Sequence, residues 1–212
     1  MKIDILSLFP NMFEGFLNES IIKRAINNEK VEINIVDFRE FSPLNNKQVD
    51  DTPYGGGAGM VLRIEPIYLA LKKIKAKNSK VILLSPEGNI FNQKKAIEYT
   101  CEKHLIIICG HYEGFDERIK SLVDEVVSIG KFVLTGGELA AMIITDACTR
   151  LLPGVINSAS LESESFNDDK YDYPVYTKPA EYENMVVPEV LLSGNHANIN
   201  LWREENKKEI QN

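Results

Sequence analysis

The sequence of 212 residues predicts an α/β protein with a parallel sheet, followed by a short helical C-terminal element. Two observations lead to this fold class. Short runs rich in β-branched residues alternate with segments whose apolar residues recur at helical spacing, as in chains whose helices connect parallel strands. After Pro153 the composition becomes polar, and one more amphipathic segment follows.

Five runs have the length and composition of buried strands. They are Ile3 to Phe9, Val31 to Phe38, Val81 to Leu84, Leu105 to Cys109 and Glu125 to Ile129. A parallel sheet is covered by helices on both faces, so its strands are continuous apolar runs rather than alternating patterns. We therefore expect these five segments to form one parallel sheet.

Four helices are predicted between and after these strands. Their ranges are Met12 to Asn27, Glu65 to Lys77, Asn92 to Lys103 and Glu138 to Leu151. Pro66 falls in the first turn of the second helix, where proline is tolerated, and Asn92 is a suitable cap for the third. A fifth helix is expected from Ile199 to Ile210, with the only tryptophan, Trp202.

The polar stretch at residues 157–184 divides the chain, because its Ser, Asp, Glu, Tyr and Pro content is typical of a linker. We expect a domain at residues 1–158, a linker at 159–178 and a short helical element at 179–212.

Charged side chains are unevenly distributed along the chain. Residues 1–160 carry 19 basic and 20 acidic side chains, whereas residues 161–212 carry 5 and 11. A nucleic-acid binder usually shows a basic face, so contact with RNA or DNA requires a local patch here.

Composition argues against several other classes. No apolar run approaches the roughly 18 residues of a membrane span, and the N-terminus lacks the pattern of a signal peptide. The three cysteines are too scattered for a disulfide framework or a CxxC zinc site, so a reducing, cytoplasmic setting is expected, with Cys109 and Cys148 in the core. The three histidines, His104, His111 and His196, lack the spacing of metal ligands.

Three predicted strands lead into loops that contain glycine or proline: LLSPEGN (83–89), CGHYEGFDER (109–118) and SIGKFVLTGGEL (128–139). In open α/β sheets ligands bind beyond the carboxyl ends of strands, and glycine lets the main chain approach a ligand. Any one of these loops could be an ordinary tight turn. Three in succession favour one pocket lined largely by main chain.

The loops also narrow the class of ligand. YGGGAGM (54–60) does not match the G-x-G-x-x-G fingerprint, and no G-K-[ST] motif is present. The loops lack a cationic cluster for a triphosphate. A ligand held by main-chain contacts and apolar walls, such as an adenosine-containing cofactor, fits them better.

An ordered set of motifs spans nearly the whole chain. The motifs are IDILSLFP (3–10), DDTPYGGGAGM (50–60), LSPEG (84–88), CGHYEGFDERI (109–119), SIGKFVLTGGELAAM (128–142), LPGV (152–155), PVYTKP (174–179) and VPEVLLSGNHANI (187–199). This set resembles the bacterial tRNA (guanine-N1)-methyltransferases of the SPOUT class. The resemblance implies a deep C-terminal trefoil knot in the sheet. It also implies methyl transfer from S-adenosylmethionine to N1 of the guanine 3′ of the anticodon in tRNA.

The resemblance assigns the three loops to the knot and to the cofactor. Leu84, Ser85 and Pro86 would flank the adenine, whereas Gly110, Tyr112 and Glu113 would lie near the ribose and the methionine end. The pocket would be completed by Ser128, Ile129, Gly130, Phe132, Leu134, Gly136 and Gly137. The family also leads us to expect Mg²⁺, but the sequence does not select the acidic residues that would hold it.

The resemblance further implies an obligate homodimer whose active sites are built from both subunits, with the helix Glu138 to Leu151 as a candidate dimer surface. Methyl transfer to a ring nitrogen that carries a proton needs a base, and a donor for the neighbouring carbonyl oxygen. These roles fall on Glu164 and Arg150. By its position alone, Arg150 also fits a surface cation that ends a helix.

The sequence departs from the family at three places. Glu164 stands where the family has aspartate, so Asp168 or Asp169 are alternative bases, and Lys178 stands where the family usually has arginine. The C-terminal element is shorter than the family's helical domain, which predicts altered tRNA binding. These departures leave two alternatives open: a related methyltransferase with another substrate, and a cofactor-binding protein without catalysis.

Overall fold

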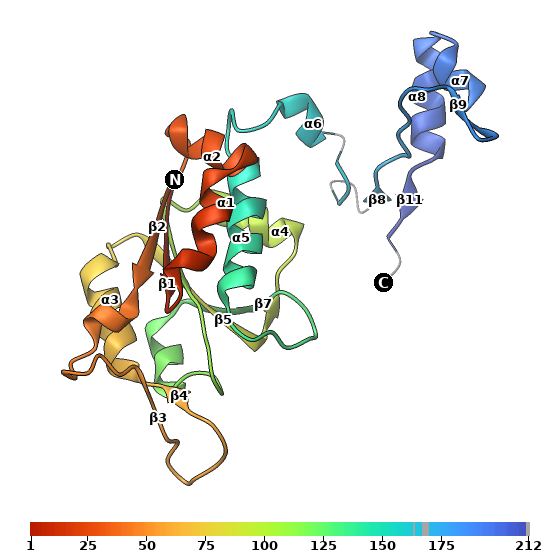
Figure 1. Cartoon of the computed structure of the whole chain (residues 1–212). Helices are drawn as coiled ribbons and strands as arrows, with labels where there is room; N and C mark the ends of the chain where they lie inside the picture. The colour runs from red at the N-terminus through yellow and green to blue at the C-terminus, as the bar shows by residue number, and fades with distance from the viewer. Residues whose placement is uncertain (163, 167–169, 211–212) are drawn as a thin grey trace. The chain divides into compact units, whose positions relative to one another are not determined.

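The computed structural model describes residues 1–162, 164–166 and 170–210 (Figure 1). The chain divides into two compact units, Met1–Ile156 and Asn157–Asn212. Each unit has its own secondary structure and is described separately below.

The first unit is built on five strands that pair in parallel in the order β2-β1-β6-β5-β7. The strands are β1 (Lys2–Ser7), β2 (Glu32–Asp37), β5 (Ser79–Ile90), β6 (His104–Ile108) and β7 (Glu125–Ser128). All five overlap the predicted strands, and the parallel sheet is confirmed. The central pair joins distant segments, because Ile3 of β1 lies opposite Leu105 of β6.

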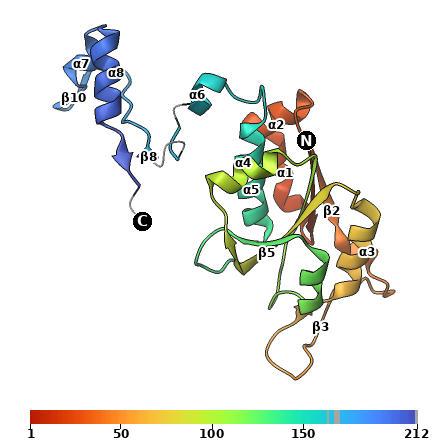
Figure 2. The ribbon, with the colours of Figure 1, turned by 180° about the vertical axis from the view of Figure 1, so that it is seen from behind.

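Helices cover both faces of this sheet (Figure 1, Figure 2). One face carries α1 (Glu14–Asn18), α2 (Ser20–Asn27), α4 (Gln93–Thr100) and α5 (Glu138–Leu151), and the other carries α3 (Ile64–Ile74). Strand β6 shows the two cores directly, since Leu105 and Ile107 belong to one apolar cluster and Ile106 and Ile108 to the other. This alternation explains why the sequence of β6 is apolar throughout.

The shorter elements of the first unit connect these layers. Three are 3₁₀ turns: η1 (Pro10–Phe13), η2 (Phe38–Phe41) and η3 (Glu117–Leu122). The strands β3 (Asp50–Asp51) and β4 (Val61–Leu62) form an antiparallel pair that brackets the glycine-rich segment 54–60. Each apolar cluster contains one fully buried phenylalanine from these turns, Phe13 of η1 and Phe38 of η2.

Helices α3 and α4 end at Ile74 and Thr100, before the predicted Lys77 and Lys103, and two other helix predictions were wrong in their bounds by more. The predicted helix from Met12 to Asn27 is interrupted, because Glu19 is extended (φ −128°, ψ 157°) and Ser20 has a positive φ of 50°. The break lets Phe13 and Ala25 enter the same apolar cluster. The helix expected from Ile199 to Ile210 is α8 (His196–Glu205), which starts early because the Asn195 side chain accepts the N–H of Asn198.

The predicted loop after Leu84 is part of a longer, irregular strand. Leu84 and Asn89 both pair with Val127 of β7, so residues 85–88 leave the ladder and β5 resumes at Asn89. By contrast, α5 has the predicted bounds, and Asn92 caps α4 by accepting the N–H of Lys95 at 3.0 Å.

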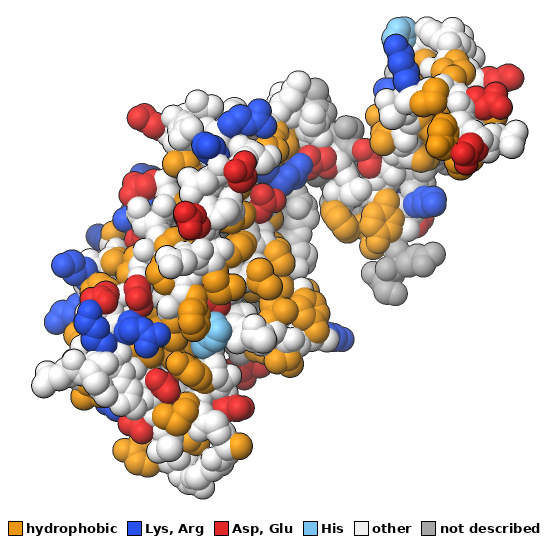
Figure 3. All heavy atoms as spheres, in the orientation of Figure 1, with side chains coloured by type: hydrophobic (Ala, Val, Ile, Leu, Met, Phe, Trp, Pro, Cys, Tyr) orange, Lys and Arg blue, Asp and Glu red, His pale blue; other side chains and the backbone are white. Residues whose placement is uncertain are grey.

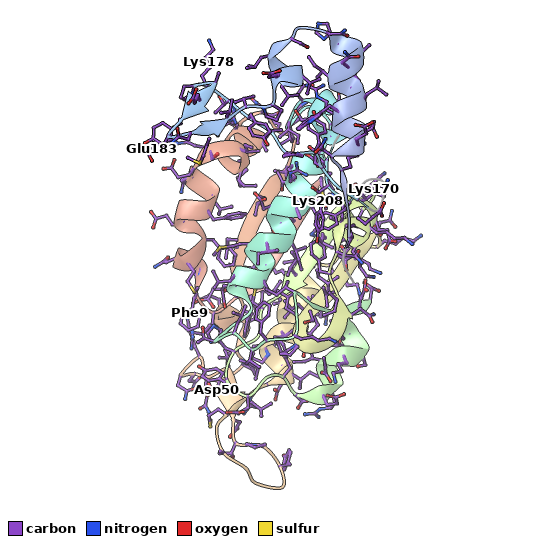
Figure 4. The ribbon with its side chains drawn as sticks, turned by 90° about the vertical axis from the view of Figure 1, so that its right-hand side faces the viewer. Phe9, Asp50, Lys170, Lys178, Glu183 and Lys208 are labelled. Carbon is purple, nitrogen blue, oxygen red and sulfur yellow. The ribbon has the colours of Figure 1, made fainter. Side chains whose placement is uncertain are left out.

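The described residues of the second unit form short helices and strands. Its helices are α6 (Ser158–Glu162), α7 (Glu189–Leu192) and α8, and its strands are β8 (Lys170–Tyr171), β9 (Glu181–Tyr182), β10 (Met185–Val186) and β11 (Lys208–Glu209). Strand β8 pairs with β11. Figure 4 labels Lys170 on β8 and Lys208 on β11. The ring of Trp202 lies 6.3 Å from that of Tyr176, and Arg203 lies 5.0 Å from the ring of Tyr173. Among the residues described in both units, no helix is long and apolar enough to cross a membrane.

A buried polar cluster joins four strands at the amino edge of the sheet. Asp4 accepts from His104 Nε2 at 2.9 Å and from Asn34 Nδ2 at 2.9 Å, and Lys2 Nζ lies 3.1 Å from the same carboxylate. The other ring nitrogen of His104 contacts Ser79 Oγ at 2.7 Å. Only 1% of Asp4 is exposed, so these partners replace the water that its charge has lost.

Replacement of Asp4 by alanine leaves buried His104 without its acceptor and removes one acceptor of the Asn34 side chain. We expect Asp4→Ala to lower the free energy of unfolding by about 3 kcal/mol, measured by urea denaturation. The matched control is Glu32→Ala, because exposed Glu32 accepts from the same Asn34 side chain at 2.9 Å. That control should stay within about 0.5 kcal/mol of wild type. Equal losses in the two variants would contradict the role given to Asp4.

Candidate active site

A cavity of about 290 Å³ opens at the bulge of β5 and beyond the carboxyl ends of β6 and β7. Its walls come from that bulge and from the segments that follow β6 and β7. Every residue predicted to contact the cofactor lines it: Leu84, Ser85, Pro86, Gly110, Tyr112, Glu113, Ser128, Ile129, Gly130, Phe132, Leu134, Gly136 and Gly137. The structure therefore brings the whole predicted set together in one place.

The same loops contribute lining residues that the sequence prediction omitted. They are His111, Gly114, Phe115, Val127, Val133, Thr135 and Ala140. Most lie between predicted residues, so their place in the loops was the available signal. The prediction omitted them because it named only residues that the family resemblance assigns to the cofactor. The cavity wall also includes neighbouring residues that the resemblance does not assign.

Two of the pocket loops touch through their backbones. The N–H of Gly137 donates to the carbonyl of Gly110 at 2.9 Å. A Cβ at position 137 would lie 2.8 Å from Cys109 Cα and 2.9 Å from Gly110 N. No side chain fits in this space, so glycine at position 137 is what allows α5 to begin directly against the end of β6.

The loop after β6 is held from its other side by the end of the glycine-rich motif. Glu113 N–H donates to the carbonyl of Met60 at 3.0 Å, and Leu62 N–H donates to the carbonyl of Gly114 at 2.9 Å. Tyr112 adopts a positive φ of 60°, which is unfavourable for a residue with a side chain. These bonds on either side of the turn help to hold Tyr112 in that conformation and place Glu113 in the cavity wall.

The buried cysteines Cys109 and Cys148 are poorly suited to act as nucleophiles. Burial, with the charge of Glu138 as a smaller cause, raises the pKa of the Cys109 thiol well above its ordinary value. Burial also raises the pKa of Cys148 to about 12. Both thiols are therefore protonated near neutral pH, and the prediction that they pack in the core is confirmed.

Arg150 lies in the last turn of α5, at the far end from the cavity. The helix begins next to Gly110 and has 14 residues, so its length is about 20 Å. Just beyond it, Leu152 lines a separate hollow together with Met1 and Lys2, at the amino edge of the sheet. The structure does not bring Arg150 to the cavity of its own chain.

Glu164 belongs to the second unit, where it is half-buried between α6 and a hydrogen-bonded turn. Next to it, Ser165 Oγ accepts the N–H of Asp172 at 3.0 Å, and Phe166 N–H donates to the carbonyl of Lys170 at 2.8 Å. The alternative bases Asp168 and Asp169 lie outside the described residues. Lys178 is exposed in the same unit.

Acidic and metal-binding side chains do not converge in the part of the chain that the structure describes. Within residues 1–162, 164–166 and 170–210, no group of three or more His, Cys, Asp or Glu side chains could hold a metal ion. Mg²⁺ commonly keeps several waters and needs only one or two carboxylates. The expectation of Mg²⁺ stays a prediction, and Glu113 is an acidic side chain in the cavity wall.

The first unit is an open parallel α/β unit, a class of proteins whose ligands commonly bind beyond the carboxyl ends of the strands, and its cavity lies on that side of the sheet. Comparison of sequences identifies the family. The chain belongs to the family described as tRNA (Guanine-1)-methyltransferase TrmD, which matches residues 1–211.

Several curated relatives named tRNA (guanine-N(1)-)-methyltransferase are similar over nearly their full length. The relative from Malacoplasma penetrans is 58% identical, over 97% of this chain and 91% of its own. The relative from Acholeplasma laidlawii is 53% identical, over 99% and 86%. The relative from Staphylococcus aureus strain JH9 is 52% identical, over 98% and 86%.

The backbone contact at Gly137 can be tested by adding one methyl group. We expect Gly137→Ala to lower the free energy of unfolding by about 1–3 kcal/mol, because the two loops must separate. Gly15→Ala is the control, since a Cβ there meets nothing within 4 Å and lies in helix α1. Denaturation in urea should show the control unchanged or more stable. Equal stability of both variants would contradict the close contact.

Proposed function

We propose that this protein transfers a methyl group from S-adenosylmethionine to N1 of the guanine 3′ of the anticodon in tRNA. Membership of the family across residues 1–211 supports this activity, as do relatives of that name at 52–58% identity. The observation that carries the proposal in the structure is the cavity, because it gathers all the residues predicted for the cofactor.

The cavity suits a cofactor of this kind in size and chemistry. Its volume of about 290 Å³ is close to the lower end of small-molecule sites, roughly 300 Å³. Glycines 130, 136 and 137 leave main chain in the cavity wall, and Leu84, Phe132 and Leu134 offer apolar contacts to a purine ring. When bound, S-adenosylmethionine supplies the methyl group as an electrophile.

The remaining chemistry is assigned to two side chains of this chain. Guanine N1 carries a proton at neutral pH, so a base must accept it while the methyl group is transferred. We assign this role to the carboxylate of Glu164. Negative charge moves toward the guanine carbonyl oxygen, and we assign its stabilisation to the guanidinium of Arg150. The segment 159–178 would then act as a linker that carries the base.

The position of Arg150 supports a homodimer with shared active sites. Its helix α5 spans about 20 Å from the cavity, so a second chain must supply the arginine if it acts there. A surface for that chain is available, because Leu139 and Ile143 of α5 are 50% and 48% exposed, and Phe9 and Met12 are 41% and 48% exposed. Hydrophobic side chains gather on this face of the first unit (Figure 3). Such a patch is typical of a protein interface.

The trefoil knot is part of the same proposal. Strand β7 pairs with β5 rather than with β6, so the chain passes β5 on its way from β6 to β7. The segment after β7 then returns to the loop after β6, where Gly137 and Gly110 meet. This order of strands and the close backbone contact between Gly137 and Gly110 are compatible with a knot, in which the C-terminal part of the first unit threads through a loop formed by an earlier segment.

The assigned base can be tested by methyl incorporation into a tRNA transcript with guanine 3′ of the anticodon. We expect Glu164→Gln and Arg150→Ala each to lower the rate by about a hundredfold or more. Glu164→Asp should keep or raise activity, because it restores the side chain usual in the family. A transcript with adenine at that position is the control. Indifference to Glu164→Gln would remove Glu164 from the mechanism, and no incorporation by wild type would remove the activity.

A mixing experiment tests whether the sites are shared. Arg150→Ala subunits keep the cavity, whereas Gly137→Ala subunits with a disrupted cavity keep the arginine. If each site takes one part from each subunit, random re-association of the two inactive variants restores about a quarter of the wild-type rate. Each variant re-associated with itself is the control. Activity that stays at the level of these controls would show that each subunit uses its own arginine.

A further inference from the structure

Glu138 is a buried carboxylate just behind the cavity. Its side chain is 1% exposed and does not itself line the wall. Both oxygens are used: Oε1 accepts from Ser7 Oγ at 2.7 Å, and Oε2 contacts His111 Nε2 at 3.0 Å. Glu138 is also the first residue of α5, where the helix dipole favours a negative charge. A buried carboxylate in this position is stable only with such partners.

The three partners come from three different strand ends. Ser7 is the last residue of β1, His111 follows β6, and Glu138 follows β7. The loop after β7 packs directly on the bond between them, since a Cβ at Gly136 would overlap His111 Nε2 and lie 2.5 Å from Glu138 Oε2. The cluster therefore ties together two of the loops that line the cavity.

His111 is held in one orientation by this cluster. A carboxylate only accepts hydrogen bonds, so the ring nitrogen that faces Glu138, Nε2, carries a proton. The ring of Phe9 lies 4.6 Å away, and the ring of Tyr112 lies edge-on at 6.2 Å. Phe9 is in turn held by its N–H, which donates to Ser7 Oγ at 2.9 Å. Figure 4 labels Phe9 toward the end of the first unit where the loop of Asp50 projects.

His111 directly precedes Tyr112 and Glu113, which the proposed cofactor site needs in a defined position. Tyr112 is strained by its positive φ, and Glu113 follows it in the cavity wall. The bond from Glu113 N–H to Met60 restrains the loop after this turn, and the bond from His111 to Glu138 restrains it before the turn. Loss of the second restraint would let the strained turn relax and move both side chains.

We propose that Glu138 is a positioning residue for methyl transfer, acting through His111 to hold Tyr112 and Glu113 where they contact the cofactor. This proposal rests on the proposed function, because it needs S-adenosylmethionine in the cavity. It goes beyond that function by giving a role to a residue that does not touch the cavity.

The test compares two buried carboxylate–histidine pairs of the same protein. The variant is Glu138→Gln, which keeps the shape of the side chain but cannot accept from both Ser7 and His111. The matched control is Asp4→Asn, which alters the pair with His104 at the opposite edge of the sheet, away from the cavity. Calorimetric titration of the full-length protein with S-adenosylmethionine gives the Kd, and circular dichroism confirms that each variant is folded.

We expect Glu138→Gln to raise the Kd for S-adenosylmethionine by roughly tenfold or more, and Asp4→Asn to leave it unchanged. An unchanged Kd in Glu138→Gln, or an equal rise in Asp4→Asn, would overturn the positioning role. Failure of wild type to bind the cofactor would instead contradict the proposed function.

A second measurement asks whether Glu138 acts through His111. In a double-mutant cycle, Glu138→Gln should add little to the rise in Kd already caused by His111→Ala, because the link is broken in either variant. Additive effects of the two substitutions would show that Glu138 acts by another route and would overturn the proposal.

Discussion

The contact between the backbones of Gly110 and Gly137 is the constraint on which the rest of the site depends. It brings the loop after β6 against the start of α5, and so it determines both the base of the cavity and the direction in which α5 leaves it. Glycine is required at position 137 for the segments after β6 and β7 to approach in this way, because any Cβ there would meet main-chain atoms. The apolar core beneath the contact, which includes Cys109 and Ala140, keeps both loops in place.

Helix α5 separates the cavity from Arg150, although the proposed reaction needs both in one site. One end of the helix lies at the cavity, with Glu138 in its first turn, and the other end holds Arg150. A rigid helix of this length cannot bend its last turn back to its first. The proposed homodimer resolves this separation, since a second copy seated on the exposed apolar side chains of α5 could present its arginine to the cavity. The symmetry of such a dimer would give two equivalent sites.

Two buried carboxylate–histidine pairs lie at opposite edges of the same sheet. Asp4 and His104 join the strands at their amino ends, and Glu138 and His111 join the loops at their carboxyl ends. Replacing such pairs by apolar residues often costs a protein little stability, so their value lies in holding specific groups in one arrangement. At the amino edge the arrangement concerns strand pairing. At the carboxyl edge it concerns the strained turn at Tyr112.

The resemblance to a family selected individual residues of the cavity wall and missed others, such as His111. The sequence by itself determined the strands, the bounds of α5 and the segments after the strands that form the cavity wall. These features depend on local patterns, since apolar runs mark buried strands, and glycines after strands mark the loops that parallel strands bring to one edge. The tertiary structure alone decided the break at Glu19, the bulge at residues 85–88, the pairing of His111 with Glu138 and the distance of Arg150 from the cavity. Each of these features depends on contacts between segments that are far apart in the chain. Local sequence patterns do not indicate which distant side chain will make a given contact.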